Sequence, residues 1–297
     1  MAVEAEQIEG TERQLPQIVT ECLKKPGSVA SLPTVAAELM RLADHPESDL
    51  NEIVGVINTD PALCARVLKV ANSSYYGFSR TIASIKHATT LLGLNAVKNI
   101  AVAASLHKVF RPHHNLTTLN PRDLWVHSLA VAIAAREISK ATGVVAADEA
   151  FLAGLMHDVG IIVEMQAFRA EFAAFEKLIL ERPEIAFRGA ERHSFGASHE
   201  DFGAGLCQMW KFPRTMEDAI ANHHATDISV EFGKLPLVIH VAELVAARAG
   251  FGFSREADSC SEPAQLLEHL SVSEAQLQSI ADELPGDVNE SLPLFAM

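Results

Sequence analysis

The sequence is poor in the residues that mark several common classes of protein. Tryptophan and tyrosine occur only twice each among 297 residues, and the prevalence of Ala, Val and Leu favours close-packed helices over sheets. The four cysteines are far apart, without a Cys-x-x-Cys pair, at Cys22, Cys64, Cys207 and Cys260. This spacing excludes a zinc ribbon and fits a reducing compartment.

Positive charge is also scarce. Lys and Arg number 24 against 38 Asp and Glu, so the formal net charge is -14, and no local basic stripe offsets it. Such a chain repels the phosphates of nucleic acids. We therefore expect no nucleic-acid partner.

Targeting and membrane signals are missing as well. The acidic stretch "MAVEAEQIEGTERQL" lacks the apolar segment of a signal peptide, and no uninterrupted apolar run reaches the ~18 residues of a membrane span. Hydrophobic residues make up 48% and charged residues 21%, which predicts a substantial core. We expect a cytoplasmic protein without a membrane partner.

Apolar residues recur at helical spacing along most of the chain, without useful strand alternation. Asp60-Pro61 and Asn120-Pro121 each place a capping side chain before a proline at the first helical position. Residues 72–80 and 111–123 are predicted breaks. The predicted helices cover 32–42, 49–57 (capped by Asp49), 61–70, 82–92, 95–109, 121–138, 149–163, 171–180, 198–210, 215–224, 236–249, 264–270 and 274–284.

The break "NSSYYGFSR" at 72–80 carries both tyrosines of the chain. Tyr75 and Tyr76 have two explanations at this point. They are either exposed contacts for a partner or a buried plug between two parts of the fold.

A His-Asp pair interrupts the apolar stretch "GLMHDVGIIV" at 154–163. A buried carboxylate is costly without a partner, and further histidines and a late glutamate also lie in apolar helical segments. Imidazole and carboxylate ligands suit iron, manganese, zinc or nickel. A bridging aspartate could hold two such cations. The candidate ligands are His127, His157, Asp158, His199, His223, His224 and Glu243.

Each candidate also has a purely structural explanation. His127 could be a hydrogen-bonded core histidine, and His223-His224 could be a helix end favoured by the macrodipole. His240 and Glu243, one turn apart, could pair with each other. The residues alone leave both explanations open.

The order of these residues is that of a known superfamily. From 124 to 243 the chain resembles the HD metal-dependent phosphohydrolases, with Glu243 in place of a final Asp. It is most similar to the HDOD family, the HD-related output domain. The motifs that carry the likeness are "LPTVAAELMRLA", "INTDPALCARVLKVANSSYYGFSRTIASIKHATTLLGL", "WVHSLAVA", "EAFLAGLMHDVGIIV", "HEDFGAGLCQMWKFP" and "AIANHH".

The resemblance implies an all-α fold, a multi-helical HD-like bundle with an N-terminal helical subdomain. The expected organisation is an N-terminal extension at 1–30, an HDOD domain at 31–250 with helical parts at 31–115 and 121–250, and an acidic helical tail at 251–297.

The resemblance also separates metal binding from catalysis. Hydrolysing relatives have a lysine after His-Asp-x-Gly and a Gly-Tyr-Pro after His-His, whereas this chain has Ile161 and "HHATDISVEFGKLP". An apolar side chain cannot neutralise a phosphate. The family therefore implies a regulatory, non-catalytic module that contacts other signalling proteins and holds one or two divalent metals, with iron or manganese favoured and zinc or nickel as alternatives.

The alternative function is a metal-dependent phosphohydrolase acting on a nucleotide or cyclic dinucleotide. Asp158 would then be the catalytic candidate. Phosphate would be held by Lys98, Arg188, Arg192 or Lys211. Taken singly, each of these is better explained as a solvated surface charge.

Overall fold

The computed structural model describes residues 13–27, 29, 32–43, 50–73, 76–110, 119–225, 232–253 and 264–295. Every regular element in these residues is helical, which confirms the predicted all-α class. The predicted cap Asp49, Tyr75 and most of the 111–123 break lie outside the described residues. The helices are α1 Gln17–Lys24, α2 Thr34–Ala43, α3 Leu50–Asn58, α4 Pro61–Ala71, α5 Ile85–Leu92, α6 Leu94–Leu106, α7 Pro121–Thr142, α8 Ala147–Met156, α9 Val159–Ala167, α10 Arg169–Glu181, α11 Phe187–Phe195, α12 His199–Met209, α13 Arg214–Asn222, α14 Leu235–Ala246, the π-helical turn Ala247–Phe251, α15 Ala264–Leu270 and α16 Glu274–Ser291.

Both predicted cap-and-proline signals begin helices. Asp60 accepts hydrogen bonds from the amides of Ala62 and Leu63, both at 3.0 Å, and α4 follows. Asn120 accepts one from the Arg122 amide at 2.9 Å, and α7 follows. These caps satisfy amide groups that the first helical turn leaves free.

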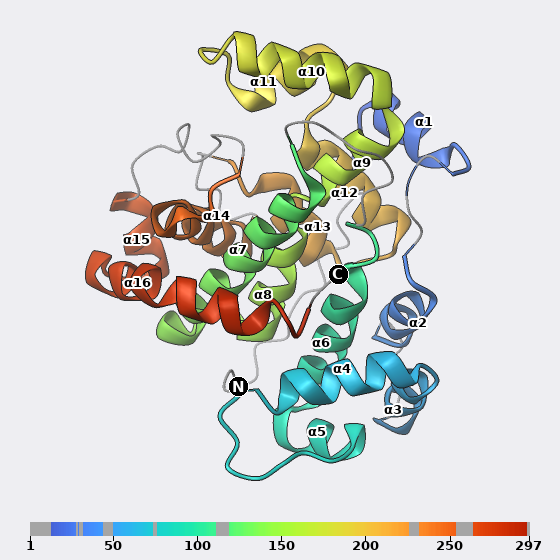
Figure 1. The fold of residues 1–297 in the computed structure, drawn as a ribbon, viewed down its shortest axis with the longest axis vertical. Coiled ribbons are helices and arrows are strands. Elements are labelled where there is room, and N and C mark those ends of the chain that lie inside the picture. The colour runs from blue at the N-terminus through green and yellow to red at the C-terminus, as the bar shows by residue number, and fades with distance from the viewer. Residues whose placement is uncertain are drawn as a thin grey trace, which may run out of the picture.

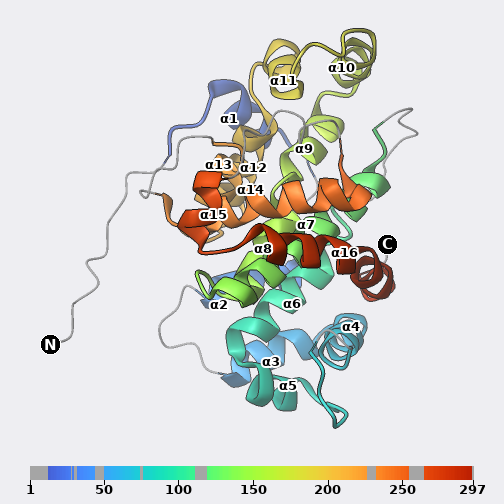
Figure 2. The same ribbon diagram turned by 90° about the vertical axis from the view of Figure 1, so that its left-hand side faces the viewer.

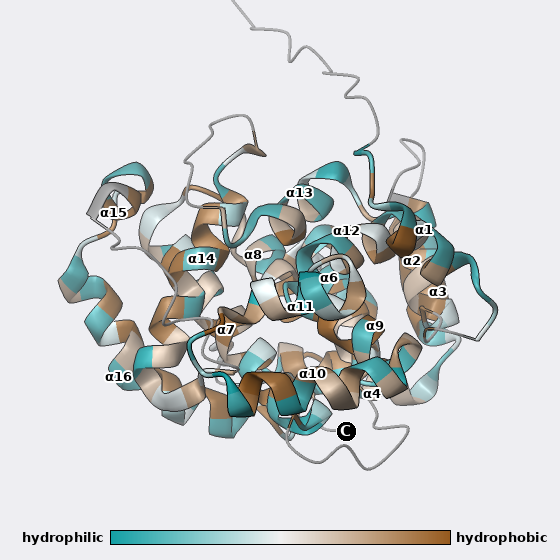
Figure 3. Ribbon diagram, turned by 90° about the horizontal axis from the view of Figure 1, so that it is seen from above, coloured by the Kyte–Doolittle hydropathy of each residue, from teal (hydrophilic) through white to brown (hydrophobic). Residues whose placement is uncertain are grey.

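The helices form an elongated bundle (Figures 1 and 2). In both side views, α3, α4 and α5 lie at one end of the long axis and α10 and α11 at the other (Figures 1 and 2). The long helix α7 packs against α8, α14 and α16. Seen from above, α10 and α16 alternate between hydrophilic and hydrophobic residues along their lengths, as helices at the rim of a core do (Figure 3).

Tyr76 joins the two parts of the fold. Its hydroxyl donates a hydrogen bond to Asp148 Oδ1 at 3.0 Å, and its ring lies 4.6 Å from the guanidinium carbon of Arg136. Tyr76 therefore fits the explanation as a plug between the helical parts, and α6 packs against α8 beside it.

The structure contains two helices that the periodicity did not predict. Helix α1 packs against α12, where a Cβ at Gly205 would lie 2.7 Å from the Val19 side chain. Helix α11 packs against α10. In the tail, the predicted helix at 274–284 runs on to Ser291, and α16 packs against α7 and α14.

The predicted single helix at 149–163 is wrong. Helix α8 ends at Met156 and α9 begins at Val159, so His157 and Asp158 form the junction. The backbone of Asp158 leaves the helical region, with φ -97° and ψ 13°. The combined stretch 147–167 is long and apolar enough to cross a membrane, but 89% of its most apolar part is buried inside the fold.

Candidate metal centre

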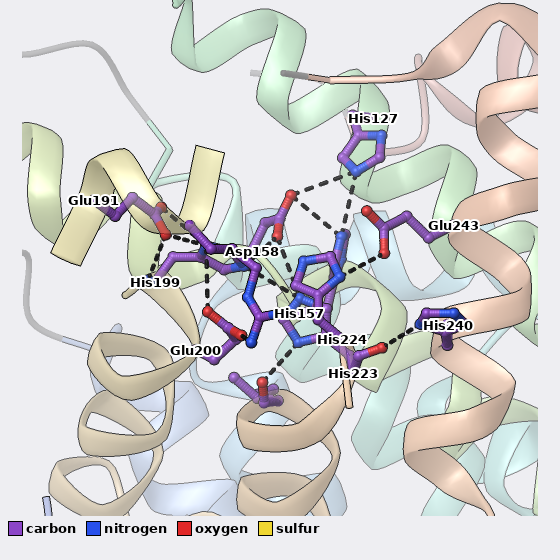
Figure 4. A network of polar contacts seen from close by, with 12 residues as sticks. His127, His157, Asp158, Glu191, His199, Glu200, His223, His224, His240 and Glu243 are labelled. Atoms are coloured by element: carbon purple, nitrogen blue, oxygen red, sulfur yellow. Dashed lines mark hydrogen bonds and ion pairs between the residues drawn. The ribbon is translucent and has the colours of Figure 1, made fainter. Parts of the chain in front are cut away.

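The seven predicted ligands converge on one point from five places in the fold. His127 lies on α7, His157 and Asp158 at the α8–α9 junction, and His199 at the start of α12. His223 and His224 follow α13, and Glu243 lies on α14. Their side chains point toward one another (Figure 4). All seven are buried.

Asp158 lies between two pairs of imidazoles. Its Oδ2 is 3.4 Å from His127 Nε2 and 3.2 Å from His157 Nε2. Its Oδ1 is 3.6 Å from His199 Nε2 and 3.7 Å from His223 Nε2. Each oxygen of one carboxylate thus faces a different pair of nitrogens, which is the arrangement of a bridging ligand.

The other ring nitrogens are held by fixed acceptors. Three Nδ1 atoms lie beside backbone carbonyls, that of His127 2.7 Å from Phe251, that of His157 2.8 Å from Gly154, and that of His223 2.7 Å from Ile220. We assign these nitrogens as the N–H donors. The Nε2 atoms are then left with lone pairs directed at Asp158, the usual arrangement of metal-binding histidines.

A cation could lie between these lone pairs. His127 Nε2 is 3.3 Å from His157 Nε2, and His199 Nε2 is 3.3 Å from His223 Nε2. Two unprotonated nitrogens cannot hydrogen-bond to each other. Two nitrogens bound to one ion at about 2.1 Å lie about 3.0 to 3.4 Å apart at octahedral or tetrahedral angles. The donor set therefore fits a metal on each side of Asp158.

Two further predicted ligands complete the cluster. The ligand atom of His224 lies within 4.8 Å of those of Asp158, His199 and His223. Glu243 lies within the same distance of His157 and His223, and its Oε2 is 3.5 Å from His224 Nδ1. The longer stem of Glu243 thus still brings a carboxylate to the site.

His240 contacts the backbone beside the His-His pair. Its Nδ1 donates to the backbone carbonyl of His223 at 2.7 Å. This bond ties α14 to the chain that carries the His-His pair.

The electrostatics of the cluster favour an ionised Asp158 and neutral imidazoles at His223 and His224. Burial alone would raise the pKa of Asp158, but His157, His127 and His223 together lower it well below its usual range. Burial and the neighbouring His224 lower the pKa of His223 to about 3. Burial, followed by His199, lowers the pKa of His224 well below its usual range. These protonation states are those that bind metal.

Two buried carboxylates beside His199 were not predicted. Glu191 Oε1 and Oε2 both lie 2.9 Å from His199 Nδ1, and Oε2 also accepts from the His199 amide at 3.3 Å. Glu200 Oε2 lies 3.7 Å from the same nitrogen. Glu191 orients the imidazole of His199, as carboxylates do behind metal-bound histidines. Helical spacing of Phe187, Ala190 and Glu191 in the stretch before His199 could have indicated this helix.

Gly160 lets α9 and α12 approach closely enough to form the centre. A Cβ at this position would lie 1.9 Å from the backbone oxygen of His199 and 2.8 Å from the Gly203 nitrogen. The glycine that follows the His-Asp pair is therefore a packing requirement that sets His199 beside Asp158.

The position of the family lysine belongs to the hydrophobic core. Ile161 is 0% exposed, so this side chain is packed in the interior of the fold. Among the four basic candidates, Arg192 and Lys211 are exposed and Lys98 is half-buried. Arg188 alone among these four forms an ion pair with a buried carboxylate of the cluster, that of Glu200.

The fold and the buried His/Asp cluster define an HD-type helical domain with groups that could hold metal. A profile described as HDOD domain matches residues 29–226. The chain belongs to the HDOD family.

Solved structures from three bacteria share the fold at identities below 25%. A putative phosphohydrolase from Shewanella amazonensis SB2B is 23% identical with a TM-score of 0.71, over 94% of this chain and 98% of that one. A putative signal transduction protein from Marinobacter aquaeolei VT8 is 22% identical with a TM-score of 0.70, over 90% and 59%. An HDOD domain protein of unknown function from Geobacter sulfurreducens is 24% identical with a TM-score of 0.68, over 90% and 97%.

One curated relative, from Treponema pallidum (strain Nichols), is 26% identical over 234 residues. The match covers 76% of this chain and 44% of the relative. The chain thus spans less than half the length of that protein.

Proposed function

We propose that this protein is a regulatory signal-transduction module that holds one or two divalent metals at the Asp158 centre without hydrolysing a substrate. It would act in the cytoplasm through contacts with other signalling proteins. The imidazole and carboxylate ligands favour iron or manganese, with zinc or nickel as alternatives.

The observation that carries the proposal is the burial of all seven candidate ligands. The most exposed of these residues is His224, at 5%. Structural metal sites are closed, whereas catalytic sites keep a position open for water or substrate. The core position of Ile161 supports the same conclusion, because a packed isoleucine offers no charge to a phosphate.

Metal analysis together with an activity assay tests the proposal. The protein is purified without added metal, its bound transition metals are quantified, and the metal-loaded sample is incubated with nucleotides and cyclic dinucleotides. We expect bound metal and no turnover. Wild type should then match Asp158→Ala in the activity assay and differ from it in metal content.

The second candidate function is a metal-dependent phosphohydrolase, and the bridging geometry of Asp158 favours it. A metal pair held this way supplies a hydroxide nucleophile near neutral pH. Turnover that Asp158→Ala and His157→Ala both abolish, in folded variants, would establish the hydrolase and overturn the non-catalytic proposal. Turnover that survives both substitutions would come from a contaminating enzyme.

A further inference from the structure

Arg188 lies at the solvent edge of the buried cluster. It is the second residue of α11, one turn before Glu191, and its side chain is 33% exposed. Its guanidinium Nη2 forms an ion pair with Glu200 Oε1. Its Nε is buried without a hydrogen-bond partner in the described residues. Arg188 is therefore held against the centre and is not a solvated surface charge.

Glu200 connects Arg188 to the metal ligands. The residue is 4% exposed, and its Oε2 lies 3.7 Å from His199 Nδ1 without accepting a hydrogen bond in the part of the chain described. A buried carboxylate oxygen without a donor is costly. The capping box of Ser198 and Asp201 holds the start of α12, where Glu200 lies.

The positive charge of Arg188 also acts on His224 and His240, two histidines across the cluster. Burial is the main cause of the lowered pKa values of His224 and His240, and Arg188 contributes to both. His240 Nε2 is buried and has no hydrogen-bond partner among the described residues. The cluster and its edge thus contain a cation, a carboxylate and an imidazole that each have one polar atom without a hydrogen-bond partner among the described residues.

We propose that Arg188 is the binding group for a phosphate-type oxyanion and that Glu200 occupies it in the resting protein. A carboxylate and a phosphate accept the same paired hydrogen bonds from a guanidinium. Replacing Glu200 by an oxyanion keeps Arg188 paired, and the N-terminus of α12 favours the incoming negative charge. The inference rests on the proposed regulatory function, because it takes the bound anion as the signal that the centre senses.

Calorimetric titration of the full chain tests the inference, with inorganic phosphate in one arm and guanosine monophosphate in the other. Glu200→Gln keeps the shape of the side chain and removes its charge, so phosphate should bind at least about 10-fold more tightly than to wild type. Arg188→Gln should abolish binding in both backgrounds, and Arg188→Lys should retain only part of it. Arg192→Gln, an exposed arginine on the same helix, should leave binding unchanged.

The two arms distinguish the source of the anion. Equal affinity for both ligands indicates free phosphate, and tighter binding of the monophosphate indicates a phosphate-bearing nucleotide. Equal phosphate affinity of wild type and Glu200→Gln, or undiminished binding by Arg188→Gln, overturns the inference. Thermal unfolding of each variant establishes that it is folded.

Metal content measured in the same samples keeps the two proposals separate. Arg188-dependent binding by a protein without metal would support the anion site and contradict the metal-holding function. A metal-filled protein without Arg188-dependent binding would support the metal-holding function and contradict the anion site.

Discussion

Asp158 organises the centre at the scale of single residues. Its two oxygens face different imidazole pairs, and backbone carbonyls or Glu191 fix the opposite nitrogens of those rings. Because each ring has one anchored nitrogen, the free nitrogens are pre-oriented toward a common point. These nitrogens and the Asp158 oxygens all present lone pairs, so a bound cation would offset the cost of burying Asp158.

His223 gives a pH prediction for the metal-free protein. Its folded pKa of about 3 lies below the ordinary histidine pKa of 6.5, so the unfolded chain takes up a proton first as pH falls. The neutral imidazole therefore contributes stability above pH 6.5 that is lost as pH falls toward 3. We expect urea unfolding in chelator to show a loss on the order of 3 kcal/mol between pH 6.5 and 4.5.

A flat profile over this window would contradict the assignment of His223 as a neutral buried imidazole. Loading with metal should shift the loss to lower pH, because the bound ion competes with protons for the same nitrogen.

At the scale of elements, the centre depends on how closely α9 approaches α12. The apolar run on both sides of His157-Asp158 has no proline, so periodicity predicted one continuous helix. The break arises from tertiary contacts around Asp158, which a local pattern does not contain. In contrast, the starts of α4 and α7 were predictable because Asp60 and Asn120 cap the helices from adjacent positions.

Gly160→Ala tests this close approach. Its new Cβ would overlap the His199 backbone oxygen, so the two helices must separate. We expect a loss of about 3 kcal/mol or more in the free energy of unfolding, with reduced metal retention. The matched control is Gly189→Ala on α11, where a Cβ meets nothing within 4 Å.

The control substitution should stabilise the protein by up to about 1 kcal/mol, because alanine is the better helix former. Equal stability of the two variants in urea denaturation would show that α9 and α12 are not held together at Gly160.

At the scale of the whole molecule, the helices before residue 110 pack on the later helices through α6 and α8, and the later helices contain the buried His/Asp cluster. The seven candidate ligands could be named from the sequence because the family order places them along the chain, and the structure brings them together. Glu191, Glu200 and the ion pair of Arg188 could not, because charged residues in a polar stretch look solvated until the fold buries them. The sequence also left two explanations for Tyr76, because its contacts with Asp148 and Arg136 arise only in the folded protein.

Tyr76→Phe tests the link between the two parts of the molecule. The substitution keeps the ring over Arg136 and removes the hydrogen bond to Asp148. We expect a loss of about 1 to 2 kcal/mol in the free energy of unfolding, measured in urea. Unchanged stability, with an unchanged dependence on denaturant, would show that this contact does not hold the halves together.

The most direct test of the central claim, that Asp158 joins two imidazole pairs into one metal centre, is the metal stoichiometry of reconstituted protein measured by mass spectrometry. Wild type and His193→Ala, which alters an exposed histidine, should each retain one to two equivalents of iron or manganese. Folded Asp158→Asn should retain less than about a tenth of that amount. Equal metal content in Asp158→Asn and wild type, or wild type that retains none, would contradict the account.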